Sequence, residues 1–307
     1  MWSHKRFHTL SHFFREKFGS KVIKLALDGG FTCPNRDGTV GEGGCIFCSE
    51  RGSGDFAGSR ENSITKQLTN QISLVAPKWP KASYLAYFQN FSGTYAPVSV
   101  LRSLHEEALA FPGVMGIAIA TRPDALPPPM IDYLRELNGR TFVWVELGLQ
   151  TIHPASATFF RRGYDLRCFE TAVNSLHRAG IHTVVHTIAG IPGETPDDLF
   201  ETMQYCGDMG IWGIKIHSLY ILEGTDLGEY YTATPFPLLS RDGYIDLVAR
   251  CLERLPPEMV IHRITGDGPR DSLLAPQWPR DKRSVLNGLD RLLSQRNTYQ
   301  GRLHGTP

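Results

Sequence analysis

The chain has little of what marks several common protein classes. None of its apolar runs approaches the roughly 18 residues that a membrane-spanning helix needs. Its N-terminus is polar and rich in histidine, without the apolar core of a signal peptide. A formal net charge of +1 over 307 residues gives no overall attraction to nucleic acid. We therefore expect a soluble, cytoplasmic protein with no membrane partner, and 41% hydrophobic content allows a substantial core.

Cysteine is also scarce, yet half of it lies in one short stretch. Three of the six cysteines, Cys33, Cys45 and Cys48, occur in C-P-N-R-D-G-T-V-G-E-G-G-C-I-F-C, a C-x11-C-x2-C pattern. One turn of backbone can aim the last two sulfurs at one metal, and the intervening glycines let the loop return the first cysteine to the same point. Thiolates are soft ligands that suit zinc or an iron–sulfur cluster. The other three cysteines are scattered, and we expect them to be core or surface thiols.

A fourth ligand is missing from this stretch. Structural zinc sites and electron-transfer clusters normally take four protein ligands, so a cluster held by three has one iron open to a small molecule. Phe47 adds a flat apolar group beside that open position. A zinc site completed by His182 or His186 and a redox pair of the two close cysteines are the alternatives. A disulfide is disfavoured because nothing marks the chain as secreted.

Apolar runs alternate with helical patterns along most of the chain. The expected strands are 22–27, 84–88, 114–120, 143–147, 183–188 and 214–219, and the expected helices are 62–75, 98–110, 130–137, 166–179, 195–209 and 244–255. Several strands recur at about the 30 residues of a βα unit. The pattern predicts an α/β fold, a partial (βα)6 TIM-like barrel, with an open doubly wound sheet as the alternative. We expect an N-terminal helical extension over 1–21, a core barrel over 22–230, and a C-terminal extension over 231–307 that covers the barrel mouth.

Several motifs resemble one enzyme family. Five stretches are similar to the YhcC/YtqA group of Elp3-like radical S-adenosylmethionine (radical SAM) proteins. They are the cysteine stretch after the first strand, A-Y-F-Q-N-F, A-T-R-P-D-A-L-P, E-L-G-L-Q-T and G-D-G-P-R-D-S-L-L-A-P-Q-W. C-S-E-R-G-S-G-D-F-A-G adds similarity to the YtqA side. The resemblance covers nearly the full chain, although the superfamily's commonest spacing is C-x3-C-x2-C. It implies that Cys33, Cys45 and Cys48 hold a [4Fe–4S] cluster whose open iron binds S-adenosyl-L-methionine.

The same resemblance implies contacts to S-adenosylmethionine at the strand ends. Gln150 and Arg162 keep the spacing of the relatives, and an amide can bond ribose hydroxyls while a guanidinium holds a carboxylate with two parallel bonds. The turn after the fifth strand is where the superfamily places the adenine. The usual Gly-Gly-Glu after the second strand is absent, so polar residues there are its candidate substitutes. The expected cofactor-binding residues are Phe47, Gln89, Glu146, Gln150, Arg162, His186, Gly190, Ile191 and Gly193.

Candidate substrate-facing residues come from the sixth strand and the C-terminal segment. They are Lys215, His217, Arg263, Asp267, Arg270 and Asp271, and a purely structural role is the alternative for each. Both ends of the chain are basic: residues 1–24 carry six Lys or Arg against one Glu, and residues 262–307 carry eight against four Asp. This asymmetry fits an anionic polymer such as tRNA without requiring it. The N-terminal charges also fit the solvated face of a helix that caps the barrel base.

The resemblance implies a reaction as well. An electron from a flavodoxin or ferredoxin would cleave S-adenosylmethionine, and a hydrogen would then be removed from the side chain of a tRNA wobble uridine. The expected change is carboxymethylaminomethyl to aminomethyl, before a partner methyltransferase acts. A radical SAM enzyme on a small-molecule or protein substrate, and a non-enzymatic zinc-binding module, are the alternatives.

Overall fold

A curled parallel sheet forms the centre of the protein. The computed structural model describes residues 2–52, 54–266 and 268–305. Within these residues seven parallel strands pair in the order β1-β2-β3-β4-β5-β6-β8. Their bounds are β1 (Val22–Leu27), β2 (Ser83–Phe88), β3 (Val114–Thr121), β4 (Phe142–Gln150), β5 (His182–Ala189), β6 (Gly213–Ser218) and β8 (Val260–Arg263). Because the described parts of β1 and β8 do not pair, the barrel is partial, as the sequence predicted.

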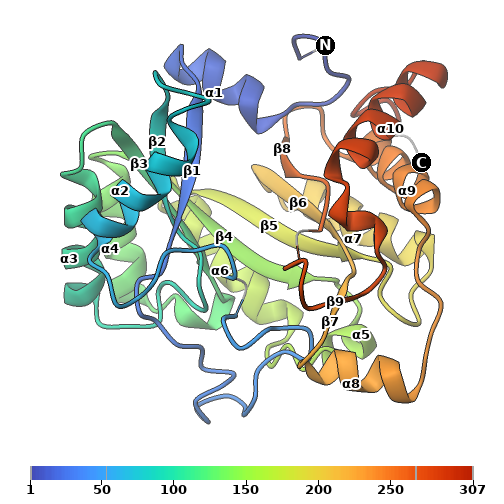
Figure 1. Ribbon diagram of the computed structural model, residues 1–307, viewed down its shortest axis with the longest axis horizontal. Helices are drawn as coiled ribbons and strands as arrows, with labels where there is room; N and C mark the ends of the chain where they lie inside the picture. The colour runs from blue at the N-terminus through green and yellow to red at the C-terminus, as the bar shows by residue number, and fades with distance from the viewer. Residues whose placement is uncertain (1, 53, 267, 306–307) are drawn as a thin grey trace.

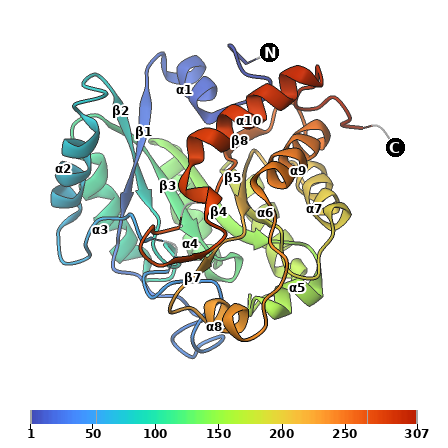
Figure 2. The same ribbon diagram turned by 45° about the vertical axis from the view of Figure 1, so that its right-hand side comes forward.

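Helices cover the outer face of this sheet (Figures 1 and 2). They are α2 (Ile64–Val75), α3 (Val98–Leu109), α4 (Pro128–Asn138), α6 (Leu166–Arg178), α7 (Pro196–Asp208) and α9 (Arg241–Arg254). The helix α10 (Lys282–Gln295) packs on α9, and α5 (Pro154–Phe159) and α8 (Asp226–Ala233) lie toward the carboxyl ends of the strands. Short 3-10 turns occupy Pro123–Ala125 and Trp278–Arg280. The strands are buried on both faces, which is why β3 reads VMGIAIAT with almost no polar alternation. The expected helices are all present within a few residues, whereas α5, α8 and α10 were not expected.

The N-terminal helix α1 (Leu10–Phe18) closes the end of the barrel where the strands begin. Thr9 caps its start, and Gly19 ends it at a φ of 64°. Phe14 faces Trp144 with ring centroids 6.1 Å apart, and Phe13 faces Trp212 at 5.0 Å. These rings fill the base of the barrel with apolar surface, in agreement with a helix that caps it.

The sheet has one strand more than predicted. β8 has only four residues, two of them His262 and Arg263, so its sequence lacks the apolar run that identified the other strands. Backbone pairing decides the matter: Gly213 lies opposite Val260, and Lys215 lies opposite Arg263. The partial barrel is therefore correct, but its count of six strands was wrong for the described residues.

The expected extension over 231–307 divides between two places. β9 (Leu273–Ala275) pairs antiparallel with β7 (Ile221–Leu222), directly after β6, and so lies at the rim of the barrel mouth. α10 instead packs against α9, where Arg296 Nη2 lies 2.5 Å from Asp246 Oδ1. No helix in the described part of the chain is long and apolar enough to span a bilayer.

Candidate active site

A cavity of about 420 Å³ lies at the carboxyl ends of the strands. Cys33, Cys45 and Cys48 all line it, which is the meeting of three thiols that the sequence predicted. Gln150 from β4 and Ile188 from β5 form part of its wall. This end of a parallel α/β barrel is where the βα loops gather and where active sites are built.

Polar contacts within the cysteine loop fix its path. Asn35 Nδ2 donates to Arg161 O (2.7 Å) and lies 3.6 Å from Cys45 Sγ. Arg36 Nη2 donates to Ser49 O (2.5 Å), which closes the loop across its two ends. Gly44 has a φ of +89°, and a Cβ there would lie 2.8 Å from Arg36 Nε. Glycine is therefore required where the loop returns toward the cavity.

Apolar packing beneath the loop anchors it to the barrel. Ile46 N donates to Phe160 O (3.2 Å), and Leu227 N of α8 donates to Ile46 O (2.9 Å). Ile46 and Phe160 share a buried cluster with Ile188 and Ile191. Phe47 packs on this cluster, its ring centroid 5.0 Å from that of Phe160, and also lines the cavity. The segment between the two close cysteines thus holds the sulfurs in place through its apolar side chains.

The thiols differ electrostatically. A hydrogen bond from Cys48, partly opposed by burial and aided by the charge of Arg122, lowers the pKa of Cys45 to about 7. The same hydrogen bond and burial raise the pKa of Cys48. A thiolate is therefore accessible at neutral pH at Cys45, as metal ligation requires.

Three buried polar atoms of cavity-lining residues have no hydrogen-bond partner among the described residues. They are Gln150 Oε1, Ser92 Oγ and His217 Nε2. Gln150 stands at a φ of 62°, and a Cβ on Gly148 would lie 2.7 Å from Gln150 Nε2. The end of β4 therefore adopts a strained backbone and needs a glycine in order to place the Gln150 amide. This arrangement indicates that the amide binds a ligand.

Arg162 lies beside this amide but is already engaged. Its Nη1 donates to Leu149 O and Thr151 O (both 2.8 Å), and its Nε donates to Tyr164 O (3.1 Å). Arg162 does line the cavity, yet only Nη2 lacks a hydrogen bond to these carbonyls. A parallel two-bond grip on a carboxylate would require Arg162 to give up a backbone partner. In this structure the guanidinium shapes the end of β4.

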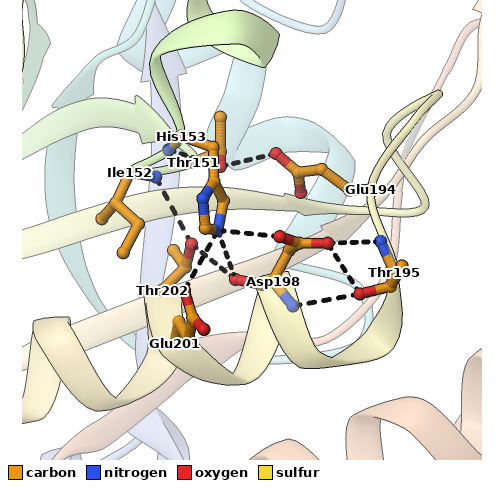
Figure 3. A network of polar contacts seen from close by, with 8 residues as sticks. All are labelled: Thr151, Ile152, His153, Glu194, Thr195, Asp198, Glu201 and Thr202. Atoms are coloured by element: carbon orange, nitrogen blue, oxygen red, sulfur yellow. Dashed lines mark hydrogen bonds and ion pairs between the residues drawn. The ribbon is translucent and has the colours of Figure 1, made fainter.

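A rim network ties the end of β4 to the start of α7 (Figure 3). Thr151 Oγ1 donates to Glu194 Oε1 (2.6 Å), and the His153 ring lies 2.9 Å from Asp198 O through Nε2. Thr195 and Asp198 form the capping box of α7. Because Thr151 follows Gln150 directly, this network fixes the backbone that carries the unpartnered amide.

A charged layer lies deeper in the barrel, around Glu146. The carboxylate accepts hydrogen bonds from Tyr87 Oη (2.7 Å) and His186 Nε2 (2.8 Å) and pairs with Lys215 and with Lys24 (3.4 Å). All five residues line the cavity. Burial would raise the pKa of Glu146, but Lys215 and Lys24 hold it well below its usual range. Glu146 and His186 thus face the cavity, although as members of a network. Lys24 and Tyr87 were missed, and a lysine inside the run VIKLAL was the available signal.

The structure brings other candidates to the cavity as well. Gln89, His217 and Arg263 line it together with Lys215. His217 is held neutral because burial, then His186 and Arg263, lower its pKa well below the ordinary value.

Some candidates lie elsewhere. Gly190, Ile191 and Gly193 are absent from the described cavity wall. Ile191 is buried under the cysteine loop, whereas Ile188 of β5 reaches the cavity, as His186 of the same strand does. Arg270 and Asp271 are exposed and do not line the cavity, because pairing of β9 with β7 holds their segment along the rim. Asp267 lies outside the described residues.

The basic N-terminal segment lies at the base, opposite the cysteine loop (Figure 1). Lys5 pairs with Asp290, and Arg6 Nη1 donates to Asn297 Oδ1 (3.2 Å). Lys5 and Arg6 therefore contact the α10 part of the C-terminal segment, far from the cavity mouth, whereas Lys24 and Arg263 line the cavity. For the N-terminus the structure favours a capping role over a phosphate-contacting patch at the mouth.

The residues present fit an iron–sulfur cluster with S-adenosylmethionine. Three thiols on a loop held by glycines and apolar packing supply three ligands and no fourth cysteine within the described wall of the cavity. The orphaned Gln150 Oε1 and Ser92 Oγ offer polar contacts to a ligand beside them.

Comparisons with known proteins agree with this geometry. Residues 33–206 match the radical SAM superfamily, and residues 211–295 match the radical SAM C-terminal domain. The chain is 49% identical over 298 residues to the uncharacterized protein YtqA of Bacillus subtilis, covering 97% of this chain and 92% of that one. It is 36% identical to the protein YhcC of Escherichia coli, covering 95% and 93%.

More distant similarities extend the picture. A tRNA uridine(34) acetyltransferase of Dehalococcoides mccartyi is 27% identical over 60% of this chain and 39% of its own. The solved structure of the archaeal Methanocaldococcus infernus Elp3, lacking residues 1–46, superposes with a TM-score of 0.67 at 16% identity, covering 92% of this chain and 64% of that one. The structural similarity establishes a shared fold.

Proposed function

We propose, from the premise that this chain belongs to the radical SAM superfamily, that it cleaves S-adenosylmethionine reductively and removes a hydrogen from the side chain of a tRNA wobble uridine. The expected conversion is carboxymethylaminomethyl to aminomethyl. After the hydrogen is removed, loss of one electron from the substrate to the flavodoxin or ferredoxin would give an imine, and water would then break the carbon–nitrogen bond and release the two carbons as glyoxylate. The observation that carries the proposal is the convergence of Cys33, Cys45 and Cys48 on one cavity that also holds the unpartnered Gln150 amide oxygen.

The chain's own residues have distinct tasks in this reaction. The three cysteines would hold the [4Fe–4S] cluster, which when bound supplies the electron for cleavage of S-adenosylmethionine. Gln150 and Ser92 would bind polar groups of S-adenosylmethionine, and Ile188 would pack on its apolar surface. Phe47 and the buried cluster beneath it exclude water from the cysteine side. The Glu146 layer forms the inner end of the cavity, which the substrate side chain would reach from the mouth.

The tRNA substrate is supported by one relative whose name specifies uridine 34 of tRNA. A tRNA reaction would take place in the cytoplasm, with flavodoxin or ferredoxin as electron donor and a methyltransferase acting on the product. The basic residues Lys5 and Arg6 add no support, because they lie at the base of the barrel against Asp290 and Asn297.

The test is an anaerobic assay. The protein is reconstituted with iron and sulfide, reduced and supplied with S-adenosylmethionine, with and without bulk tRNA from a strain lacking the gene. We expect 5′-deoxyadenosine that rises with tRNA, together with a changed wobble uridine. Cleavage indifferent to tRNA would contradict the tRNA assignment and favour a small-molecule or protein substrate. Zinc without sulfide in the purified protein would contradict the radical chemistry itself.

A further inference from the structure

The inner end of the cavity is one layer of inward-facing side chains. On the first five strands, each residue of this layer follows by two positions a residue of the apolar cluster at the base. These base residues are Val22, Leu85, Ala118, Trp144 and Val184. The strand register places His186 opposite Lys215 and Lys215 opposite Arg263. The residues of this layer that line the cavity are Lys24, Tyr87, Ala120, Glu146, His186, Lys215 and Arg263. This polar layer, the floor of the cavity, therefore packs directly on the apolar cluster at the base of the barrel.

Glu146 is fully occupied within this floor. Oε1 accepts from Trp144 Nε1 (2.9 Å) and pairs with Lys24, while Oε2 accepts from Tyr87 and His186 and pairs with Lys215. Its side chain has no exposed surface. Glu146 is thus a fixed counter-charge that holds the two lysines, and no oxygen of it is left for a substrate.

Two lysines pair with one carboxylate in this layer, so the three groups carry a net positive charge whenever both lysines are protonated. Lys215 is almost completely buried, whereas the Lys24 side chain keeps 21% of its surface exposed, and Lys24 lines the cavity. Burial lowers the pKa of Lys24, Glu146 opposes part of that, and Arg263 lowers it further. A buried positive charge beyond what the protein neutralises is costly unless a ligand compensates it.

We propose that this layer binds a carboxylate of the substrate, with Lys24 Nζ as the direct contact and Lys215 and Tyr87 as its support. This inference deepens the proposed function. It rests on that function in assuming that the substrate side chain enters the cavity from its mouth. A singly charged, planar carboxylate suits the layer better than a phosphate dianion, because Glu146 stands beside both lysines. His217 Nε2, buried without a partner among the described residues, lies on the same strand as Lys215 and would meet a neighbouring polar atom of the arm.

The test compares two RNAs that differ in charge alone. Two anticodon stem-loops carry at the wobble uridine either a carboxymethylaminomethyl group or its carboxamide, and their affinities for the cluster-loaded protein with S-adenosylmethionine are measured by fluorescence anisotropy. We expect about tenfold tighter binding of the carboxylate RNA by the wild type, as for one charge-assisted hydrogen bond. Lys24→Met should reduce this preference to within about twofold, and Lys24→Arg should retain most of it.

Lys81→Met is the matched control, because Lys81 is exposed and outside the cavity. Any loss of general RNA attraction affects both RNAs equally, so Lys81→Met should leave the preference unchanged. Equal binding of the two RNAs by the wild type, or a preference that survives Lys24→Met, would overturn the carboxylate assignment and leave the proposed RNA function standing.

If neither RNA binds, the proposed function fails, and small molecules decide the inference separately. N-methylglycine and its amide are then compared for thermal stabilisation of the same holoprotein. Stabilisation by the carboxylate alone, lost in Lys24→Met, would support a carboxylate site for another substrate. Equal effects of the two compounds would overturn it.

Discussion

The two ends of the barrel interior are built on opposite principles, and β4 shows the change within two residues. Trp144 packs among the aromatic rings at the base, whereas Glu146 is held by two lysines, a histidine and a tyrosine below the cysteines. A hydrogen bond from Trp144 Nε1 to Glu146 Oε1 joins the two layers. The base therefore supplies apolar stability, and the mouth concentrates costly charges and unpartnered polar atoms, which are typical of a site.

Cys45→Ser should have the largest effect of these substitutions, and the effect should be confined to the mouth of the barrel. We expect loss of one cluster ligand and essentially complete loss of S-adenosylmethionine cleavage, because the loop has no spare cysteine. Iron and sulfide content and 5′-deoxyadenosine formation measure the effect. Cys168→Ser, on α6 and outside the cavity, should behave as wild type; a Cys45→Ser protein with normal cleavage would contradict the site.

Glu146→Gln should show the cost of the charges at the inner end. Removal of the carboxylate charge would leave Lys24 and Lys215 inside the barrel without their anionic partner. We therefore expect the free energy of unfolding to fall by about 3 to 5 kcal/mol in urea denaturation. Glu106→Gln breaks an exposed pair with Arg140 and should cost less than about 1 kcal/mol. Similar losses of unfolding free energy in the two variants would mean that Glu146 does not stabilise the buried lysines.

Phe14→Ala should damage the base and spare the mouth. Phe14 is 3% exposed and packs on Trp144, so truncation should lower unfolding free energy by about 3 kcal/mol. Cluster content and cleavage per folded molecule should not change at a temperature well below the midpoint. Leu74→Ala, at a residue 77% exposed, serves as the control for side-chain truncation. Loss of the cluster in Phe14→Ala would show that the two ends are coupled.

His186 gives the smallest of these effects, as a pH dependence. Burial, with the charge of Lys215, lowers its pKa to about 4, so between pH 4 and about 6.5 the unfolded chain binds a proton that the folded one does not. Its contribution to stability is present above about pH 6.5 and is lost as the pH falls toward 4, on the order of 2 to 3 kcal/mol. His186→Gln keeps a donor for Glu146 but cannot titrate there. Denaturation curves from pH 7 to 4.5 should be flatter for the variant; parallel curves would refute this.

The sequence by itself determined the parts that depend on local spacing. The three cysteines, the glycines that return their loop and the alternation of strands and helices are readable because they recur at short, fixed distances. Gln150 was instead expected from the family resemblance, and its amide oxygen has no partner among the described residues.

Only the tertiary structure decided which side chains meet inside the barrel, because this depends on how the sheet curls. The floor formed by Lys24, Tyr87 and Glu146 joins three strands separated by up to 122 positions along the chain, and its side chains meet because register and curvature turn them inward. The same closure placed the four-residue β8 in the sheet, brought Ile188 instead of Ile191 to the cavity and engaged Arg162 with backbone carbonyls. Local patterns carry the residue types, but hydrogen-bond partners and inward direction are set by the neighbours that folding brings together.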